Sequence, residues 1–179
     1  DLFISTDYER DFGVGKTILV AGGGFIQDAK EALIGLSNRY DSVILILDDF
    51  IFSEFDKEGV ERVIKTVKGF DYMRLTPAEY VKSKLEVNKV PLDHPYYSSL
   101  QVAIWRIEYL VKVLDQSKNI WEVEKQRLSK NHFFTREHLF RYRHVVEKGK
   151  WDWRARRIIE SQNMRFNSNG VQHQYISIV

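Results

Sequence analysis

The sequence contains no cysteine, no long apolar run and little excess charge of either sign, and each absence excludes a class of protein. Without cysteine the 179-residue chain has neither a disulfide framework nor a thiolate metal site, and a reducing, cytoplasmic compartment is favoured. No apolar run approaches the roughly 20 residues that span a bilayer, so we expect no transmembrane segment. A formal net charge of +2 gives no electrostatic reason to expect nucleic acid as a partner.

What the chain does contain is an ordinary globular composition, with 44% hydrophobic and 29% charged residues. Its length suits one domain with a sizeable core. We therefore expect residues 1–162 to form one domain. We expect residues 163–179, where no hydrophobic period persists, to form a loose C-terminal tail.

Strand-like and helix-like patterns alternate through the first half of the chain. Val43–Leu47 is a continuous β-branched and aliphatic run, typical of a central strand buried on both faces. Helical spacing of apolar residues predicts helices over Phe25–Asn38 and Lys57–Val67. This alternation predicts an α/β fold with a mainly parallel central sheet flanked by helices. Three further elements are expected later in the chain: helices over Val102–Leu114 and Ile120–Leu128, and a strand over Phe140–Val146.

Two glycine-rich segments resemble phosphate-binding motifs only in part. Gly13–Thr17 ends in Gly-Lys-Thr but has Arg10 where a phosphate-binding loop requires its first glycine. Gly22–Gly24 precedes a predicted helix without the G-x-G-x-x-G spacing of dinucleotide sites. We interpret the second segment as a tight turn onto the helix.

The most informative feature is a pair of acids, Asp48 and Asp49, directly after the predicted strand Val43–Leu47. Ligands bind at the carboxyl ends of strands in open parallel sheets. Two adjacent carboxylates repel each other, and a divalent cation completed by substrate phosphate oxygens stabilises both in the charged form. The alternative is an acidic turn that caps the next element.

Six segments together resemble the bacterial and viral nucleotide-sugar glycosyltransferases with the GT-A fold. The acid pair lies in a segment that resembles the metal-binding Asp motif of that family, and the other segments follow in the family's order. The matching segments are Phe3–Arg10, Ile44–Phe50, Phe70–Leu75, Tyr97–Trp105, Asn119–Glu124 and Val145–Trp151. Asn119–Glu124 resembles the Trp-x-x-Glu motif that carries the catalytic acid.

The resemblance implies a GT-A-like, metal-dependent enzyme of surface polysaccharide or glycan synthesis. Such an enzyme moves a sugar from a nucleoside-diphosphate sugar to a hydroxyl of a saccharide acceptor, with Mn²⁺ or Mg²⁺ as cofactor. It would act in the cytoplasm, with peripheral association at the inner face of the membrane as an option. The metal motif is Asp-Asp rather than Asp-x-Asp, which leaves open whether Asp48 or Asp49 contacts the metal.

Transfer with inversion at the anomeric carbon needs a base that takes the proton of the acceptor hydroxyl. The Trp-x-x-Glu match points to Glu124 as this base, with Glu122 as the second choice. Both acids also suit a structural role, because negative charge is favourable at a helix N-terminus.

Further site residues are expected around these acids. Thr6 and Tyr8 follow the first strand, where a ring stacks on a nucleotide base and a hydroxyl fixes it. Lys148 and Lys150 are candidates to neutralise the diphosphate, and His144 is a candidate third metal ligand. For the acceptor hydroxyls we expect Ser98, Ser99 and Gln101.

Two other functions fit the same residues. A metal-dependent nucleotidyltransferase also places metal-binding acids at strand ends. A non-catalytic carbohydrate-binding domain would keep the fold without turnover, although it has little use for clustered acids.

Overall fold

The computed structural model describes residues 1–9, 15–78, 84–147, 150–155, 157 and 176–178. The elements in chain order are β1 (Phe3–Thr6), β2 (Lys16–Leu19), α1 (Phe25–Leu36), β3 (Ser42–Leu47), β4 (Phe50–Phe55), α2 (Lys57–Thr66), β5 (Tyr72–Arg74), β6 (Val87–Lys89), β7 (Ala103–Arg106), α3 (Ile107–Asp115), α4 (Ile120–Val123), β8 (His132–Thr135), β9 (Phe140–His144), β10 (Val146–Glu147), β11 (Lys150–Trp151) and β12 (Ile176–Ile178).

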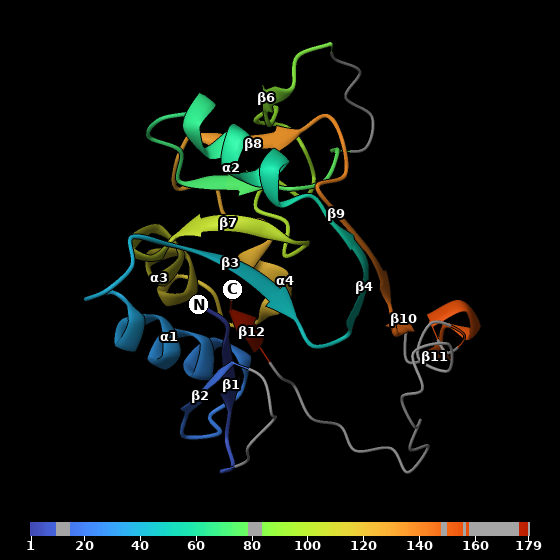
Figure 1. Ribbon diagram of the computed structural model, residues 1–179. Coiled ribbons are helices and arrows are strands. Elements are labelled where there is room, and N and C mark those ends of the chain that lie inside the picture. Colours follow the sequence, from blue (N-terminus) through green and yellow to red (C-terminus); the bar gives the residue numbers. More distant parts are fainter. Residues whose placement is uncertain (10–14, 79–83, 148–149, 156, 158–175, 179) are drawn as a thin grey trace.

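An eight-stranded mixed sheet in the order β2-β1-β12-β3-β7-β5-β8-β6 forms the centre of the molecule (Figure 1). The pairs β1–β2 and β5–β8 are parallel, and the other neighbouring pairs of this sheet are antiparallel. The expected mainly parallel sheet flanked by helices is therefore wrong. The domain is a small mixed α/β structure with antiparallel and mixed sheets and few helices.

Two antiparallel strands explain the difference. The segment expected to be a helix over Val102–Leu114 begins as strand β7, which pairs with both β3 and β5. The helix α3 starts only at Ile107. β12 comes from the segment expected to be an irregular tail, and it pairs between β1 and β3. Strands β1, β3 and β5 share a direction, but β12 separates β1 from β3 and β7 separates β3 from β5.

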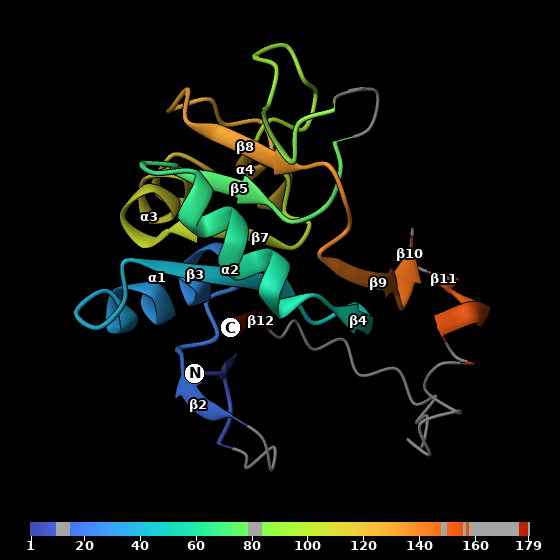
Figure 2. The same ribbon diagram turned by 45° about the horizontal axis from the view of Figure 1, so that its top comes forward.

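Strand β3 is central, as its apolar run predicted, and its residues alternate between two cores. Val43 and Leu45 pack on one face with residues of α1 and α3. Ile46 packs on the other face with Val60 and Val63 of α2. Helices thus lie on both sides of the sheet (Figures 1 and 2). Neither face of β3 is therefore open to solvent.

The other predicted elements agree in part with the structure. The helix predictions over 25–38 and 57–67 correspond to α1 and α2, and Phe140–Val146 contains β9. The helix predicted over Ile120–Leu128 is much shorter, since α4 ends at Val123. Asn119 caps α4 by accepting a hydrogen bond from the backbone N–H of Glu122.

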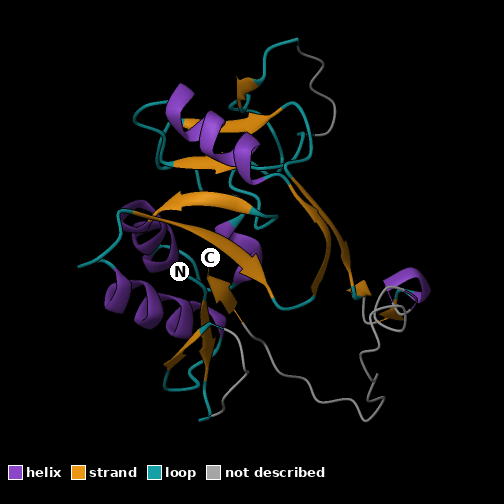
Figure 3. Ribbon diagram, in the orientation of Figure 1, coloured by secondary structure: helices purple, strands orange, loops and turns teal. Residues whose placement is uncertain are grey.

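Strands β4 and β9 form a separate two-stranded antiparallel ribbon beside the main sheet (Figure 3). β4 begins at Phe50, directly after the acid pair, and its first residue pairs with His144 at the end of β9. The ring of Phe50 stacks on that of Tyr142 at a centroid distance of 4.4 Å. This ribbon places the end of β9 against the end of β3.

Candidate functional site

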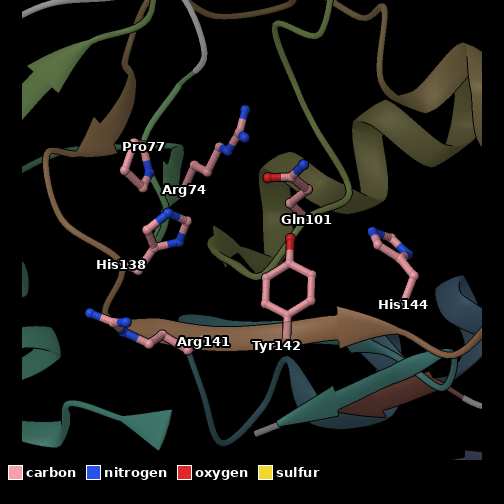
Figure 4. Close-up of a pocket in the computed structure, with 7 residues that line it drawn as sticks. All are labelled: Arg74, Pro77, Gln101, His138, Arg141, Tyr142 and His144. Carbon is pink, nitrogen blue, oxygen red and sulfur yellow. The ribbon is translucent and has the colours of Figure 1, made fainter. Parts of the chain in front are cut away.

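The candidate site lies at one edge of the main sheet, where β3, β5 and β8 all end. These strands share a direction, because β3 and β5 are both antiparallel to β7 and β8 is parallel to β5. A cavity of about 440 Å³ opens at this edge (Figure 4). It is of the size of small-molecule sites, and its lining residues are Arg74, Pro77, Gln101, His138, Arg141, Tyr142 and His144.

His144, which lines this cavity, contacts Asp49. The Nδ1 atom of His144 lies 3.3 Å from Oδ2 of Asp49. The backbone N–H of Val145 donates to the carbonyl of Asp49 at 2.6 Å, which fixes the two chain segments side by side. The other oxygen of Asp49, Oδ1, is buried and has no hydrogen-bond partner among the described residues.

A carboxylate and an imidazole suit a divalent ion such as Mn²⁺ better than Mg²⁺, which prefers oxygen ligands alone. The buried oxygen of Asp49 without a partner fits this use, since such an atom is costly unless a cation or donor reaches it. The described residues hold no group of three His, Asp or Glu side chains that would bind a metal unaided. Substrate phosphate oxygens would complete the coordination. Asp48 is exposed in the turn before Asp49.

Glu122 in α4 and Glu124 directly after it have different surroundings. Oε1 of Glu124 accepts hydrogen bonds from the backbone N–H of Leu100 at 2.9 Å and from the Ser99 hydroxyl at 3.4 Å. Glu122 forms an arrangement similar to a capping box: its own N–H donates to the N-cap Asn119, and its carboxylate accepts from the N–H of Lys118, the residue before the cap, at 2.8 Å. Glu124 therefore faces the segment that leads to Gln101, whereas Glu122 stabilises a helix end.

Of the three predicted acceptor residues, Gln101 lines the cavity. Its side-chain oxygen accepts a hydrogen bond from the Thr76 hydroxyl at 3.1 Å. Ser98 is buried and donates to the carbonyl of Gln126 at 2.8 Å. Ser99 is also buried, beside Glu124. The two serines thus position the loop, and Gln101 is the side chain that can reach a ligand.

The prediction from sequence missed the basic wall of the cavity, which consists of Arg74, His138 and Arg141 (Figure 4). Burial lowers the pKa of His138, and the charges of Arg141 and Arg74 lower it further. One signal was available in the sequence. Arg74 interrupts the apolar run Met73–Leu75 of a buried strand, where a charged residue requires a reason.

Tyr142 lies between the acidic and the basic parts of the site. Burial raises the pKa of its phenol, the charge of Arg74 opposes that rise, and the charges of Asp49 and Glu124 add to it. Figure 4 shows the Tyr142 hydroxyl directed toward Gln101.

The two residues expected to bind the nucleotide, Thr6 and Tyr8, are not among the described lining residues of the cavity. Thr6 is buried at the end of β1, where its hydroxyl accepts from the N–H of Tyr8 at 3.4 Å. The N–H groups of Gly23 and Gly24 donate to the carboxylate of Asp28, as expected for a turn onto α1.

The structure describes little of Lys148 and Lys150. Lys148 lies outside the described residues, and Lys150 is placed only through the backbone pairing of β11 with β10. Their predicted role beside the diphosphate stays a prediction.

Within the described part of the chain, no helix is both long and apolar enough to cross a bilayer. Comparison with protein-family models, with curated proteins and with solved structures gave no match.

Proposed function

We propose that this chain is a metal-dependent glycosyltransferase domain. It would transfer a sugar, with inversion, from a nucleoside-diphosphate sugar to a hydroxyl of a saccharide acceptor, in the synthesis of surface polysaccharide or another glycan. The observation that carries the proposal is the contact of Asp49 with His144, because His144 lines the same cavity as Gln101. This contact supports a site in which the expected metal ligands lie near an expected acceptor-binding residue.

In the proposed reaction, the acceptor oxygen attacks the anomeric carbon and forms the new glycosidic bond. The bond from that carbon to the diphosphate breaks, and its electron pair leaves with the nucleoside diphosphate. Glu124 takes the acceptor proton. Asp49 and His144 would hold Mn²⁺, which supplies positive charge for the departing diphosphate.

The position of Glu124 supports its role as base. Its carboxylate is held by Leu100 and Ser99, one and two residues before Gln101, so that the base and the acceptor-binding side chain belong to one local structure. A catalytic group needs such fixed support to act at a defined atom. The proposal includes a cytoplasmic location, favoured by the absence of cysteine, with peripheral contact at the inner face of the membrane.

The test is an assay of product release from a panel of nucleoside-diphosphate sugars, with Mn²⁺ and with a chelator. Metal-dependent release of nucleoside diphosphate, stimulated by saccharides, is expected. Release of pyrophosphate from nucleoside triphosphates would point instead to nucleotidyl transfer. Metal-dependent binding of nucleoside diphosphate without turnover of any donor would point to a binding domain.

A further inference from the structure

Arg74 is a buried cation that lines the cavity. The residue is only 6% exposed, and its Nε donates to the Thr76 hydroxyl at 2.8 Å. Within the described part of the chain, no carboxylate lies within ion-pair distance of its guanidinium. A buried charge without a counter-ion is costly. Such an arrangement is typical of a site that an anionic ligand completes.

Arg141 has a different environment although it lines the same cavity. Its Nε lies 2.9 Å from a carboxylate oxygen of Glu54, and both side chains are largely exposed. The charge of Arg141 is therefore already paired and screened by solvent. Among the described residues, Arg74 has no such carboxylate partner, which leaves its charge available to an anionic ligand.

The hydrogen bonds of Arg74 connect it to the acceptor side of the site. Arg74 donates to Thr76, and Thr76 donates in turn to the side-chain oxygen of Gln101. Asp49 and His144 lie at the end of β3 and of the ribbon, whereas Arg74 lies at the end of β5. The proposed metal ligands and the buried cation beside Gln101 are therefore at separate places.

We propose that Arg74, with Gln101 beside it, binds an anionic group, a carboxylate or a phosphate, carried by the acceptor saccharide. The proposal of an acceptor rests on the proposed function, but the binding of an anionic sugar does not. A planar guanidinium fixed through Nε presents its two terminal nitrogens to a carboxylate or phosphate in a geometry that both groups match.

The experiment measures binding of single sugars to the full chain by isothermal titration calorimetry, without donor. The probes are D-glucuronate, D-glucose 6-phosphate, D-glucose and inorganic phosphate. Since charge-assisted hydrogen bonds are the strong ones, we expect at least one anionic sugar to bind about tenfold or more tightly than D-glucose. Which of the two binds better distinguishes a carboxylate from a phosphate site. This preference should weaken at high salt.

The decisive variants are Arg74→Gln and its matched control Arg39→Gln. The new glutamine can still donate to Thr76, whereas the charge and the two terminal nitrogens of the guanidinium are lost. Arg39 is exposed in the turn after α1, before β3 begins and therefore at the opposite edge of the sheet. Arg74→Gln should abolish the preference for the anionic sugar, and Arg39→Gln should leave it intact. If Arg74→Gln fails to fold by circular dichroism, Arg74→Lys replaces it and should keep part of the preference.

Three outcomes would overturn the inference. The first is equal affinity for D-glucose and both anionic sugars, and the second is binding of inorganic phosphate as tight as that of D-glucose 6-phosphate. The third is a loss of metal-dependent UDP binding in Arg74→Gln as large as its loss of anionic-sugar binding, which would assign Arg74 to the donor. Anionic-sugar binding that depends on Arg74 in a protein that turns over no nucleotide sugar would uphold the inference and reject the proposed function.

Discussion

Nδ1 of His144 lies 3.3 Å from a carboxylate oxygen of Asp49, although the two residues are 95 positions apart in the sequence. The contact arises because β4 starts next to Asp49 and β9 returns along it, so that Phe50 pairs with His144. The pairing of the ribbon thereby places His144 against Asp49, the acid that follows the end of β3. The first two predictions follow from this pair.

Asp49→Ala is expected to lower the affinity for nucleoside diphosphate in Mn²⁺ by about 100-fold or more, since losing even an indirect support of a metal costs 10–100-fold. The fold should survive, because the bond to Val145 uses the backbone carbonyl of Asp49. Calorimetry with UDP and GDP measures the affinity. The matched variant Asp48→Ala should have a smaller effect, because Asp48 is exposed. Equal affinity of the wild type in the presence of a chelator would contradict the metal role of the pair.

His144→Gln is expected to weaken Mn²⁺-dependent binding of the diphosphate by about 10–100-fold. Because both side chains would serve one ion, the effects of His144→Gln and Asp49→Asn should not add in a double-mutant cycle. Additive losses would show that the two residues act at separate places. His138→Gln serves as the control, since His138 lines the same cavity on its basic wall.

The central strand and the acids at its end could be predicted from the sequence, and the neighbours of that strand could not. Val43–Leu47 has apolar residues at every position, which only a strand covered on both faces requires. In contrast, the apolar residues between Val102 and Leu114 fit helical spacing throughout, and the pattern does not mark where β7 gives way to α3. The pairing of β7 with β3 and β5 sets that boundary, and the local spacing of apolar residues does not predict this pairing.

The candidate site shows the same division. Asp49 and Gln101 could be proposed from the sequence because they lie in segments with recognisable patterns, and their roles stay predictions. Arg74 was missed because its importance comes from burial and from the absence of a nearby carboxylate among the described residues, which are properties of the folded chain. Likewise, only the structure separates the capping role of Glu122 from the inward position of Glu124.

Glu124→Gln should lower turnover by about 10²–10⁴-fold, the usual contribution of general-base catalysis, while donor affinity stays nearly unchanged. The glutamine oxygen can still accept from the N–H of Leu100, so the loop should keep its position. Glu122→Gln is the matched control, because glutamine is also accepted in a capping box, and turnover should remain. Proton NMR of the product should show the inverted anomeric configuration, and a retained configuration would end the assignment of Glu124 as a base.

The last prediction concerns His132, a fully buried histidine on β8. Its Nδ1 lies 3.1 Å from the carbonyl of Tyr97, which can only accept, so Nδ1 carries the proton and Nε2 accepts from the hydroxyl of Tyr109 at 2.8 Å. Burial lowers the pKa of His132 to about 4, against the opposite effects of the Tyr97 carbonyl and the charge of Asp71. The unfolded chain therefore binds this proton near pH 6.5, and the folded chain only near pH 4.

Because His132 is held neutral in the folded protein, its titration makes the free energy of unfolding depend on pH. The full contribution of His132 is present above pH 6.5 and is lost as the pH falls to about 4. The difference between the two pKa values corresponds to about 3 kcal/mol of unfolding free energy. Denaturant unfolding at several pH values measures the slope of stability over this window. Other groups titrate there as well, so the informative quantity is the difference between wild type and His132→Gln, whose slope should be shallower. His138→Gln, at a more exposed position, should change the slope less, and identical slopes for wild type and His132→Gln would mean that folding does not change the pKa of His132.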